Sequence, residues 1–338
     1  MTLLVNELRG IDRVAIVVYA GASGVVLEPT PGTEKQQILS AIGRLQGGGS
    51  TNAGAGIQLA YELARKHFDR SGINRVILAT DGDFNVGITS RSDLLDLIEK
   101  ERKSGVFLTV LGVGCGNLQD SQMEMLADKG NGNYAYLDSI AEAEKVLVRE
   151  AGGTLVTIAK DVKIQVEFNP IRVGRYRLIG YENRRLAARD FNDDKKDAGE
   201  IGAGHSVTAL YEITMPGDHG DGTDPLRYQS PRRTEGEAFG DEMLFVKVRY
   251  KAPDGDVSRL VQQPVTDPGN VSYGSTSRDF RFAAAVATFG MALRESPERG
   301  SASYALAKEL LAGTVGDDPH GERRALAGLI DRAAARTR

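Results

Sequence analysis

The chain has 338 residues, a formal net charge of −4, 41% hydrophobic and 26% charged residues, and no tryptophan. This is a globular composition, and the length predicts two domains because most domains hold roughly 100–200 residues. The slight negative charge excludes a general electrostatic affinity for nucleic acid. No run approaches the roughly 20 apolar residues of a transmembrane segment. Met1–Gly10 lacks the apolar core of a signal peptide, so the compartment is left open, with the cell envelope expected if an export segment lies upstream.

The first 150 residues alternate between short apolar runs and amphipathic stretches. Val14–Ala20 is almost continuously apolar, which is typical of strands buried on both faces. Gly24–Leu27 follows too closely for a crossover helix, so the two runs predict a hairpin. Further strands are expected at Arg75–Ala79 and Val106–Val113, each after an amphipathic segment. This alternation predicts an α/β fold with a doubly wound sheet over residues 1–150.

The pattern changes after residue 150. Val162–Phe168 alternates strictly between apolar and polar residues, which predicts a strand with its polar side in water. Similar strands are expected at 175–181, 206–214, 243–250 and 259–265. From Ser277 onward the periodicity is helical. Residues 151–338 are therefore predicted to form a second domain, with a β-sandwich at about 154–268 and a helical tail at about 277–338.

Two stretches resemble a von Willebrand factor A domain: Gly47-Gly48-Gly49-Ser50-Thr51-Asn52 and Val76-Ile77-Leu78-Ala79-Thr80-Asp81-Gly82. In that family a metal-ion-dependent adhesion site lies at the carboxyl ends of the central strands. An Asp-x-Ser-x-Ser loop, a threonine and an aspartate build it. The resemblance implies a Rossmann-like fold in which Thr51 and Asp81 are the metal ligands. It also implies that ligand contacts come from their neighbours, Gly49, Ser50, Asn52, Gly82 and Asp83.

A second motif narrows the resemblance. The run Phe191-Asn192-Asp193-Asp194-Lys195-Lys196-Asp197-Ala198-Gly199-Glu200-Ile201-Gly202-Ala203-Gly204-His205 is similar to that of the YfbK-type bacterial proteins. In those proteins an A domain precedes a dedicated C-terminal region. The resemblance covers essentially the whole chain.

The chain departs from the A-domain pattern at its start. No Asp-x-Ser-x-Ser occurs before Asp12, so strand one and the first metal loop are missing. We therefore expect an N-terminal truncation, with Met1 at an internal position of a longer protein. By the resemblance, strand one belongs between the Val14 and Val76 strands, and its loss leaves two strand edges. Two ligands seldom dehydrate Mg²⁺, so we expect the chain to bind Mg²⁺ or Mn²⁺ weakly or not at all.

Catalytic motifs are weak in comparison. The glycine-rich loop before Ala53 lacks the lysine of a P-loop, and Cys115 has no visible activating partner. We therefore expect a protein-interaction module without enzymatic activity, which binds an acidic side chain of a protein partner. Two alternatives stay open. One is a metal-assisted hydrolase using Asp81, Asp83 and Asp218, and the other is an adaptor for an ATPase chaperone.

Overall fold

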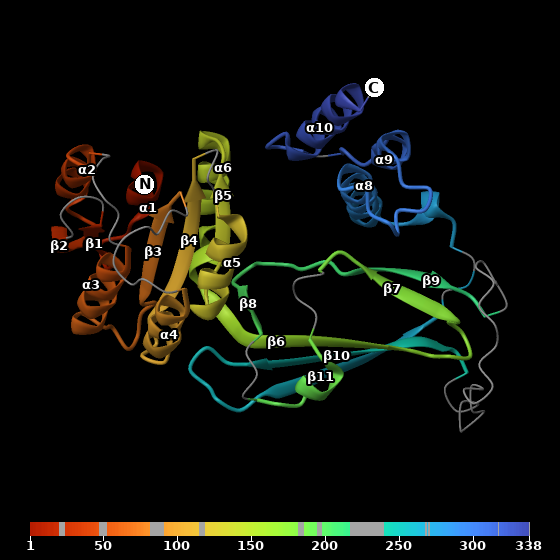
Figure 1. Ribbon diagram of the computed structural model, residues 1–338, viewed down its shortest axis with the longest axis horizontal. Helices are drawn as coiled ribbons and strands as arrows, with labels where there is room; N and C mark the ends of the chain where they lie inside the picture. Colours follow the sequence, from red (N-terminus) through yellow and green to blue (C-terminus); the bar gives the residue numbers. More distant parts are fainter. Residues whose placement is uncertain are drawn as a thin grey trace. The chain divides into compact units, whose positions relative to one another are not determined.

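The computed structural model describes most of the chain (Figure 1). The described residues are 1–19, 24–46, 53–81, 91–114, 119–181, 186–194, 198–216, 240–267, 269, 271–316 and 318–337. They divide into two compact units. The first comprises Met1–Ile164, Ala188–Ser206 and Val248–Val261, and the second comprises Gln165–Ala187, Val207–Lys247 and Gln262–Arg338. The predicted domain boundary at residue 150 remains a prediction.

Helices and strands alternate in the first part of the chain, as predicted. The elements are α1 (Thr2–Glu7), β1 (Arg13–Val18), β2 (Gly24–Pro31), α2 (Lys35–Gly43), α3 (Ala53–Lys66), β3 (Arg75–Thr80), α4 (Arg91–Arg102), β4 (Phe107–Val113), α5 (Asp120–Lys129), β5 (Tyr134–Leu137), α6 (Ile140–Glu144), the π-helical turn η1 (Lys145–Arg149) and α7 (Ala151–Leu155). Strands β3, β4 and β5 form a parallel sheet with β4 in the middle. β1 and β2 form the predicted antiparallel hairpin. The α/β, Rossmann-like class is thus confirmed.

Helices cover both faces of the parallel sheet. On one face, Tyr61 of α3, Ile98 of α4 and residues of α5 pack against Val110 of β4. On the other face, Leu111 of the same strand packs against Leu147 of η1. Because both faces of β4 are covered, its residues can be continuously apolar, which is the signal that the sequence carries.

The hairpin and the parallel sheet approach each other without strand pairing. Within the described ranges, β1 pairs with β2 and β3 pairs with β4, and no backbone ladder joins the two sheets. A side chain makes a connection instead, because the Tyr19 hydroxyl donates a hydrogen bond to the carbonyl oxygen of Ala79 (2.7 Å). β3 is therefore an edge strand on the side that faces the hairpin.

This arrangement predicts unequal hydrogen exchange within one sheet. Amides of β3 have a ladder partner on one side, whereas β4 is paired on both sides, so β3 is expected to exchange faster. Exchange measured by mass spectrometry on peptides that cover 75–80 and 107–113 checks this. Equal slow exchange in both peptides, in a monomeric sample, would show that the β3 edge is covered in solution.

The second part of the chain is built from longer strands followed by helices. Its elements are β6 (Thr157–Phe168), β7 (Arg175–Ile179), the 3-10 turn η3 (Ala188–Asp190), β8 (Gly199–Gly202), β9 (Leu210–Thr214), β10 (Glu242–Lys251), β11 (Arg259–Thr266), the 3-10 turn η5 (Tyr273–Ser275), α8 (Arg278–Leu293), α9 (Tyr304–Leu311) and α10 (Glu322–Arg336). One sheet has the order β11-β10-β6-β8, and β7 pairs with β9. β8 lies inside the Phe191–His205 motif and was not predicted.

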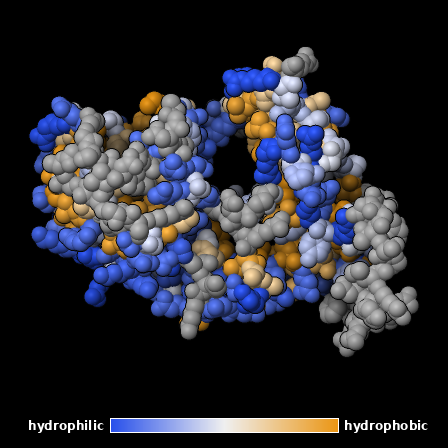
Figure 2. Space-filling view, viewed as in Figure 1, coloured by the Kyte–Doolittle hydropathy of each residue, from blue (hydrophilic) through white to orange (hydrophobic). Residues whose placement is uncertain are grey.

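The prediction that the polar side chains of β6 face water is partly wrong. Lys163 is only 3% exposed, whereas the neighbouring Ile164 is 51% exposed. Asp161 has a positive φ of 52°, and the pairing with β8 shifts register around it. Figure 2 shows hydrophobic side chains reaching the surface in the region of β6, β10 and β11. Simple alternation fails because a later segment, described below, covers the Lys163 side.

The helical tail has its own small core. Ala285 of α8, Ala307 and Leu311 of α9 and Ile330 of α10 are buried together, which confirms the helical periodicity. The hydroxyls of two serines cap α8 and α9, where they accept hydrogen bonds from the amides of Phe280 and Leu306. None of the helices in the described ranges combines the length and the apolar character needed to cross a membrane.

Candidate functional site

The described part of the predicted site lies at the carboxyl ends of the parallel strands. Asp81 directly follows β3 and is exposed. Gly114 follows β4, and a Cβ built on it would lie 3.6 Å from the Cβ of Asp81. In doubly wound sheets, ligands bind beyond the carboxyl ends of the strands. The structure therefore places Asp81 where the fold provides a binding edge.

Tyr19 connects three elements at this edge. Its hydroxyl hydrogen-bonds to Ala79 at the end of β3, and its side chain packs on Gly56 in the first turns of α3. A Cβ on Gly56 would overlap the Cβ of Tyr19, so only glycine allows this approach. Burial raises the pKa of the Tyr19 phenol, a hydrogen bond with Thr80 lowers it, and the negative charge of Asp81 raises it again. Tyr19 thus remains a neutral donor that joins the hairpin, α3 and β3.

Two further tyrosines reach the same edge from β5. The Tyr136 hydroxyl donates to the carbonyl oxygen of Gly114 (2.7 Å), and Tyr136 is 36% exposed. The Tyr134 hydroxyl donates to the carboxylate of Asp120 in the first turn of α5 (2.5 Å). Burial raises the pKa of Tyr134, and the hydrogen bond to Asp120 raises it further. Tyr19, Asp81, Gly114 and Tyr136 are called the carboxyl edge below.

Sequence reasoning missed the three tyrosines. Tyr19 closes an apolar run, so it looked like one more core residue, and Tyr134 and Tyr136 stand in a short strand with a weak signal. Their spacing of two does place both side chains on one side of that strand. This spacing, together with the parallel order, is a signal that could have found them.

The other predicted site residues lie outside the described residues. These are Gly49, Ser50, Thr51, Asn52, Gly82 and Asp83. The same holds for Cys115 and Asp218. Across the described ranges, no group of three or more His, Cys, Asp or Glu side chains could hold a metal ion. The described donors at the carboxyl edge therefore do not by themselves fit Mg²⁺ or Mn²⁺, which prefer a near-octahedral set of oxygen ligands.

The Phe191–His205 motif is held by two buried lysines. Lys251, 7% exposed, donates to the Asp161 carboxylate and to the carbonyl oxygen of Asp194, both at 2.6 Å. Lys163 donates to the carbonyl oxygens of Asp190 (3.3 Å) and Asp193. An ammonium group that is removed from water needs such partners. Through these hydrogen bonds the two lysines hold residues 190–194 against β6 and β10 in the first unit.

The glycines of the same motif serve close backbone packing. Gly202 in β8 faces the backbone of α7, and a Cβ there would overlap the carbonyl oxygen of Gly153. The amide of Ala203 donates to the carbonyl oxygen of Val156 (2.8 Å). The Asn133 side chain, just before β5, donates to Gly153 (3.3 Å). This motif therefore has a structural role, connecting β8 to α7 and to the residue that follows it.

Two family models match successive parts of the chain. Residues 2–148 match the model described as von Willebrand factor type A domain. Residues 153–335 match the model described as Uncharacterized protein YfbK, C-terminal. The protein from Escherichia coli (strain K12) described as Uncharacterized protein YfbK is 44% identical over 98% of this chain. The chain spans 57% of the length of that relative.

Solved structures with similarity to the chain include two that carry the A-domain description or a metal. The structure described as von Willebrand factor type A from Catenulispora acidiphila shares 15% identity and covers 96% of this chain and 75% of its own, with a TM-score of 0.48. The manganese-loaded TRAP protein of Plasmodium vivax shares 21% identity and covers 40% of this chain and 58% of its own, with a TM-score of 0.34.

Proposed function

The chain belongs to the family of bacterial proteins that join a von Willebrand factor type A domain to a YfbK-type C-terminal domain, and from this we propose that it binds a protein partner through its carboxyl edge. A-domains generally act as interaction modules. The proposal is a binding function without catalysis. The observation that carries it is the convergence of Asp81, Gly114 and Tyr136 at the ends of three adjacent strands.

The chemistry of this edge suits a protein surface. Tyrosines are enriched among the residues that dominate protein–protein interfaces, because a rigid ring and a hydroxyl act together. Tyr136 and Asp81 are both accessible, so a partner can contact a ring, a carboxylate and the backbone of Gly114 at once. Hydrogen bonds from Tyr19 and Tyr136 to backbone carbonyls hold this edge in place before binding.

The proposal includes a metal ion only where the complete metal site of the family is present. There Thr51 and Asp81 would hold Mg²⁺ or Mn²⁺ together with a loop from strand one, and an acidic side chain of the partner would complete the coordination.

Replacement of Asp81 by alanine is expected to reduce partner retention by at least about tenfold, as for a residue at the centre of an interface. The full chain is immobilised, incubated with bacterial lysate, and the retained proteins are quantified by mass spectrometry. A candidate partner is a protein that the immobilised wild type retains above the level of the matrix without protein. Because Asp81 is exposed, the melting temperature should stay unchanged.

Asp96→Ala is the matched control, since Asp96 is an exposed aspartate on α4. It should retain the partner at the wild-type level. Titration calorimetry with Mn²⁺ alone, on the wild type and Asp81→Ala, measures the metal contribution separately. A partner that both variants retain equally would contradict binding through the carboxyl edge.

A further inference from the structure

A slot lies between the hairpin and the parallel sheet of the first unit. β1 and β3 flank it, and within the described ranges neither strand has a ladder partner on this side. Tyr19 follows β1, and its hydroxyl reaches the carbonyl oxygen of Ala79 in β3 (2.7 Å), so the carboxyl ends of the two strands lie near each other. Because a side chain and not a ladder makes this connection, the strands are further apart than the roughly 4.8 Å of paired neighbours.

The edge of β3 presents backbone groups to the slot. In a parallel sheet both backbone groups of one residue point to one neighbouring strand, and those of the next residue point to the other side. The carbonyl oxygen of Asn74 accepts a hydrogen bond from the amide of Phe107 in β4 (3.1 Å), so the even-numbered residues of β3 face β4. The odd-numbered residues face the slot, and these are Arg75, Ile77 and Ala79. The hydrogen bond that Tyr19 donates to Ala79 comes from this side.

Two helices cover the two faces of the slot. On one face α3 contacts both β1 and β3, and its Ile57 shares a core with Leu78 of β3. On the other face α1 packs in two directions. Its Val5 belongs to the core of the hairpin, whereas its Leu4 and Ile77 of β3 pack against the same buried residues. A strand in this slot is therefore covered on both faces, which requires an apolar sequence.

Exposed residues beside the slot show what the two strands lack. Ala15 of β1 and Ala79 of β3 are exposed, although helices contact both strands. In β4, which is paired on both sides, Leu108–Gly112 are all buried. The difference between β3 and β4 is a second neighbouring strand, because both are covered by helices.

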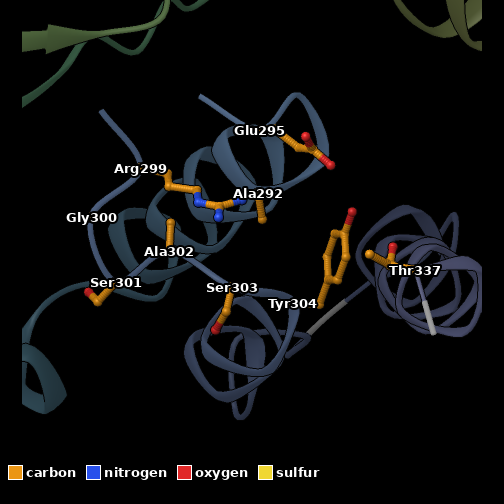
Figure 3. Close-up of a pocket in the computed structure, with 9 residues that line it drawn as sticks. All are labelled: Ala292, Glu295, Arg299, Gly300, Ser301, Ala302, Ser303, Tyr304 and Thr337. Carbon is orange, nitrogen blue, oxygen red and sulfur yellow. The ribbon is translucent and has the colours of Figure 1, made fainter. Parts of the chain in front are cut away.

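The pocket of the helical tail does not select a ligand in this way. Figure 3 shows it at the ends of α8 and α10 and the start of α9, with Glu295 and Arg299 among its lining residues. Both residues are exposed, so water already solvates their charges. The slot differs, because its backbone groups and its apolar faces both specify a strand.

We propose that the slot between β1 and β3 binds an extended apolar segment of another polypeptide, which adds as a strand parallel to β3. Backbone hydrogen bonds to the two strand edges supply affinity, and the side chains under α1 and α3 select an apolar sequence. The Tyr19 hydroxyl occupies the Ala79 carbonyl oxygen in the free protein and leaves it when the strand enters. The slot does not depend on the proposed partner of the carboxyl edge, because its contacts come from the strand edges and not from Asp81.

A peptide that copies β4 is the probe, because β4 already pairs in parallel with β3 and is covered on both faces. It carries Phe107–Val113 between flanking lysines and a fluorescent label. Fluorescence anisotropy with the full chain is expected to give a dissociation constant of about 100 μM or tighter. Versions that are N-methylated at alternate residues, in either frame, keep the apolar side chains but lose the donors to one edge. Each should bind at least about tenfold more weakly.

Hydrogen exchange resolved to single residues locates the bound peptide. The amides of Ile77 and Ala79 face the slot, so their exchange should slow by about tenfold or more on binding. The amide of Leu78 faces β4 and should change less. This alternation is specific for a strand that pairs with β3, because general stabilisation slows neighbouring amides alike.

Two variants of the full chain should change peptide binding in opposite directions. Ala79→Pro removes an amide that faces the slot and no donor of the β4 ladder, so the peptide should bind at least about tenfold more weakly. Tyr19→Phe removes the competing hydroxyl, so the peptide should bind roughly two- to tenfold more tightly. This second variant keeps the test decisive if Ala79→Pro does not fold. Asp96→Ala, an exposed position on α4, should bind as the wild type does.

Four results would overturn the proposal. The peptide fails to bind at about 1 mM, either N-methylated version binds as well as the parent peptide, or Leu78 gains as much protection as Ile77. The fourth is a chain that sediments as a dimer with the β3 edge already protected, because a second copy then occupies the slot.

Discussion

Replacement of Gly202 by alanine is expected to lower the free energy of unfolding by about 3 kcal/mol or more. The new methyl group would overlap the carbonyl oxygen of Gly153, which is backbone and cannot rotate away as a side chain could. To make room, β8 must separate from α7, and the hydrogen bond from Ala203 to Val156 (2.8 Å) is then lost. The midpoint of urea unfolding measures the effect.

Gly199→Ala is the matched control in the same strand. No atom lies within 4 Å of the position that its Cβ would take, and its φ is not positive. The expected change is below about 1 kcal/mol, with a stabilising sign possible because alanine restricts the unfolded chain. Equal midpoints for the two variants would show that β8 and α7 are not in close contact.

Replacement of Lys251 by methionine is expected to lower the free energy of unfolding by about 3 kcal/mol. The substitution leaves the partly buried carboxylate of Asp161 without its cation. The Lys251 and Asp161 side chains are 9% and 16% exposed, and their ion pair spans 2.6 Å. The variant also removes the donor to the Asp194 carbonyl oxygen. Methionine fills much the same volume, so the loss reports the charge and the hydrogen bonds rather than a cavity.

Two comparisons make this result specific. Lys247→Met changes another lysine of β10. The Lys247 ammonium lies 3.4 Å from the carboxylate of Glu167, whose side chain is 68% exposed. This substitution should lower the free energy of unfolding by less than about 1 kcal/mol. The double variant with Asp161→Asn removes the unpaired carboxylate and should recover part of the loss, since asparagine tolerates the positive φ of residue 161. If the double variant loses as much unfolding free energy as Lys251→Met and Asp161→Asn lose together, a direct Lys251–Asp161 interaction is contradicted.

Much of the A-domain architecture could be predicted from the sequence. The apolar run that became β4 predicted a strand covered on both faces, and the structure confirms it. The same prediction for β1 is wrong, because this strand has only exposed and half-buried residues. The hairpin followed from the short distance between its strands. The helical tail followed from its periodicity in the same way. These signals are local, because each pattern depends only on residues a few positions apart in the sequence.

The candidate site could be predicted only in part. Asp81 was identified by resemblance, and its place at a strand end agrees with the structure. The hydrogen bonds from Tyr19 to Ala79 and from Tyr136 to Gly114 join residues 60 and 22 positions apart. No periodicity reports such a contact, because it depends on how three strands are placed side by side.

The sequence by itself determined the order of helices and strands, because apolar residues recur with a period of about 2 in strands and 3.6 in helices. Only the tertiary structure decided which polar residues are buried. Lys163 and Lys251 look like solvent-facing positions of alternating strands, yet residues 190–194 cover them and accept their hydrogen bonds. Gly202 looks like a turn residue, yet α7 lies against it. In each case the deciding group is tens of residues away, so its effect exists only after the chain has folded.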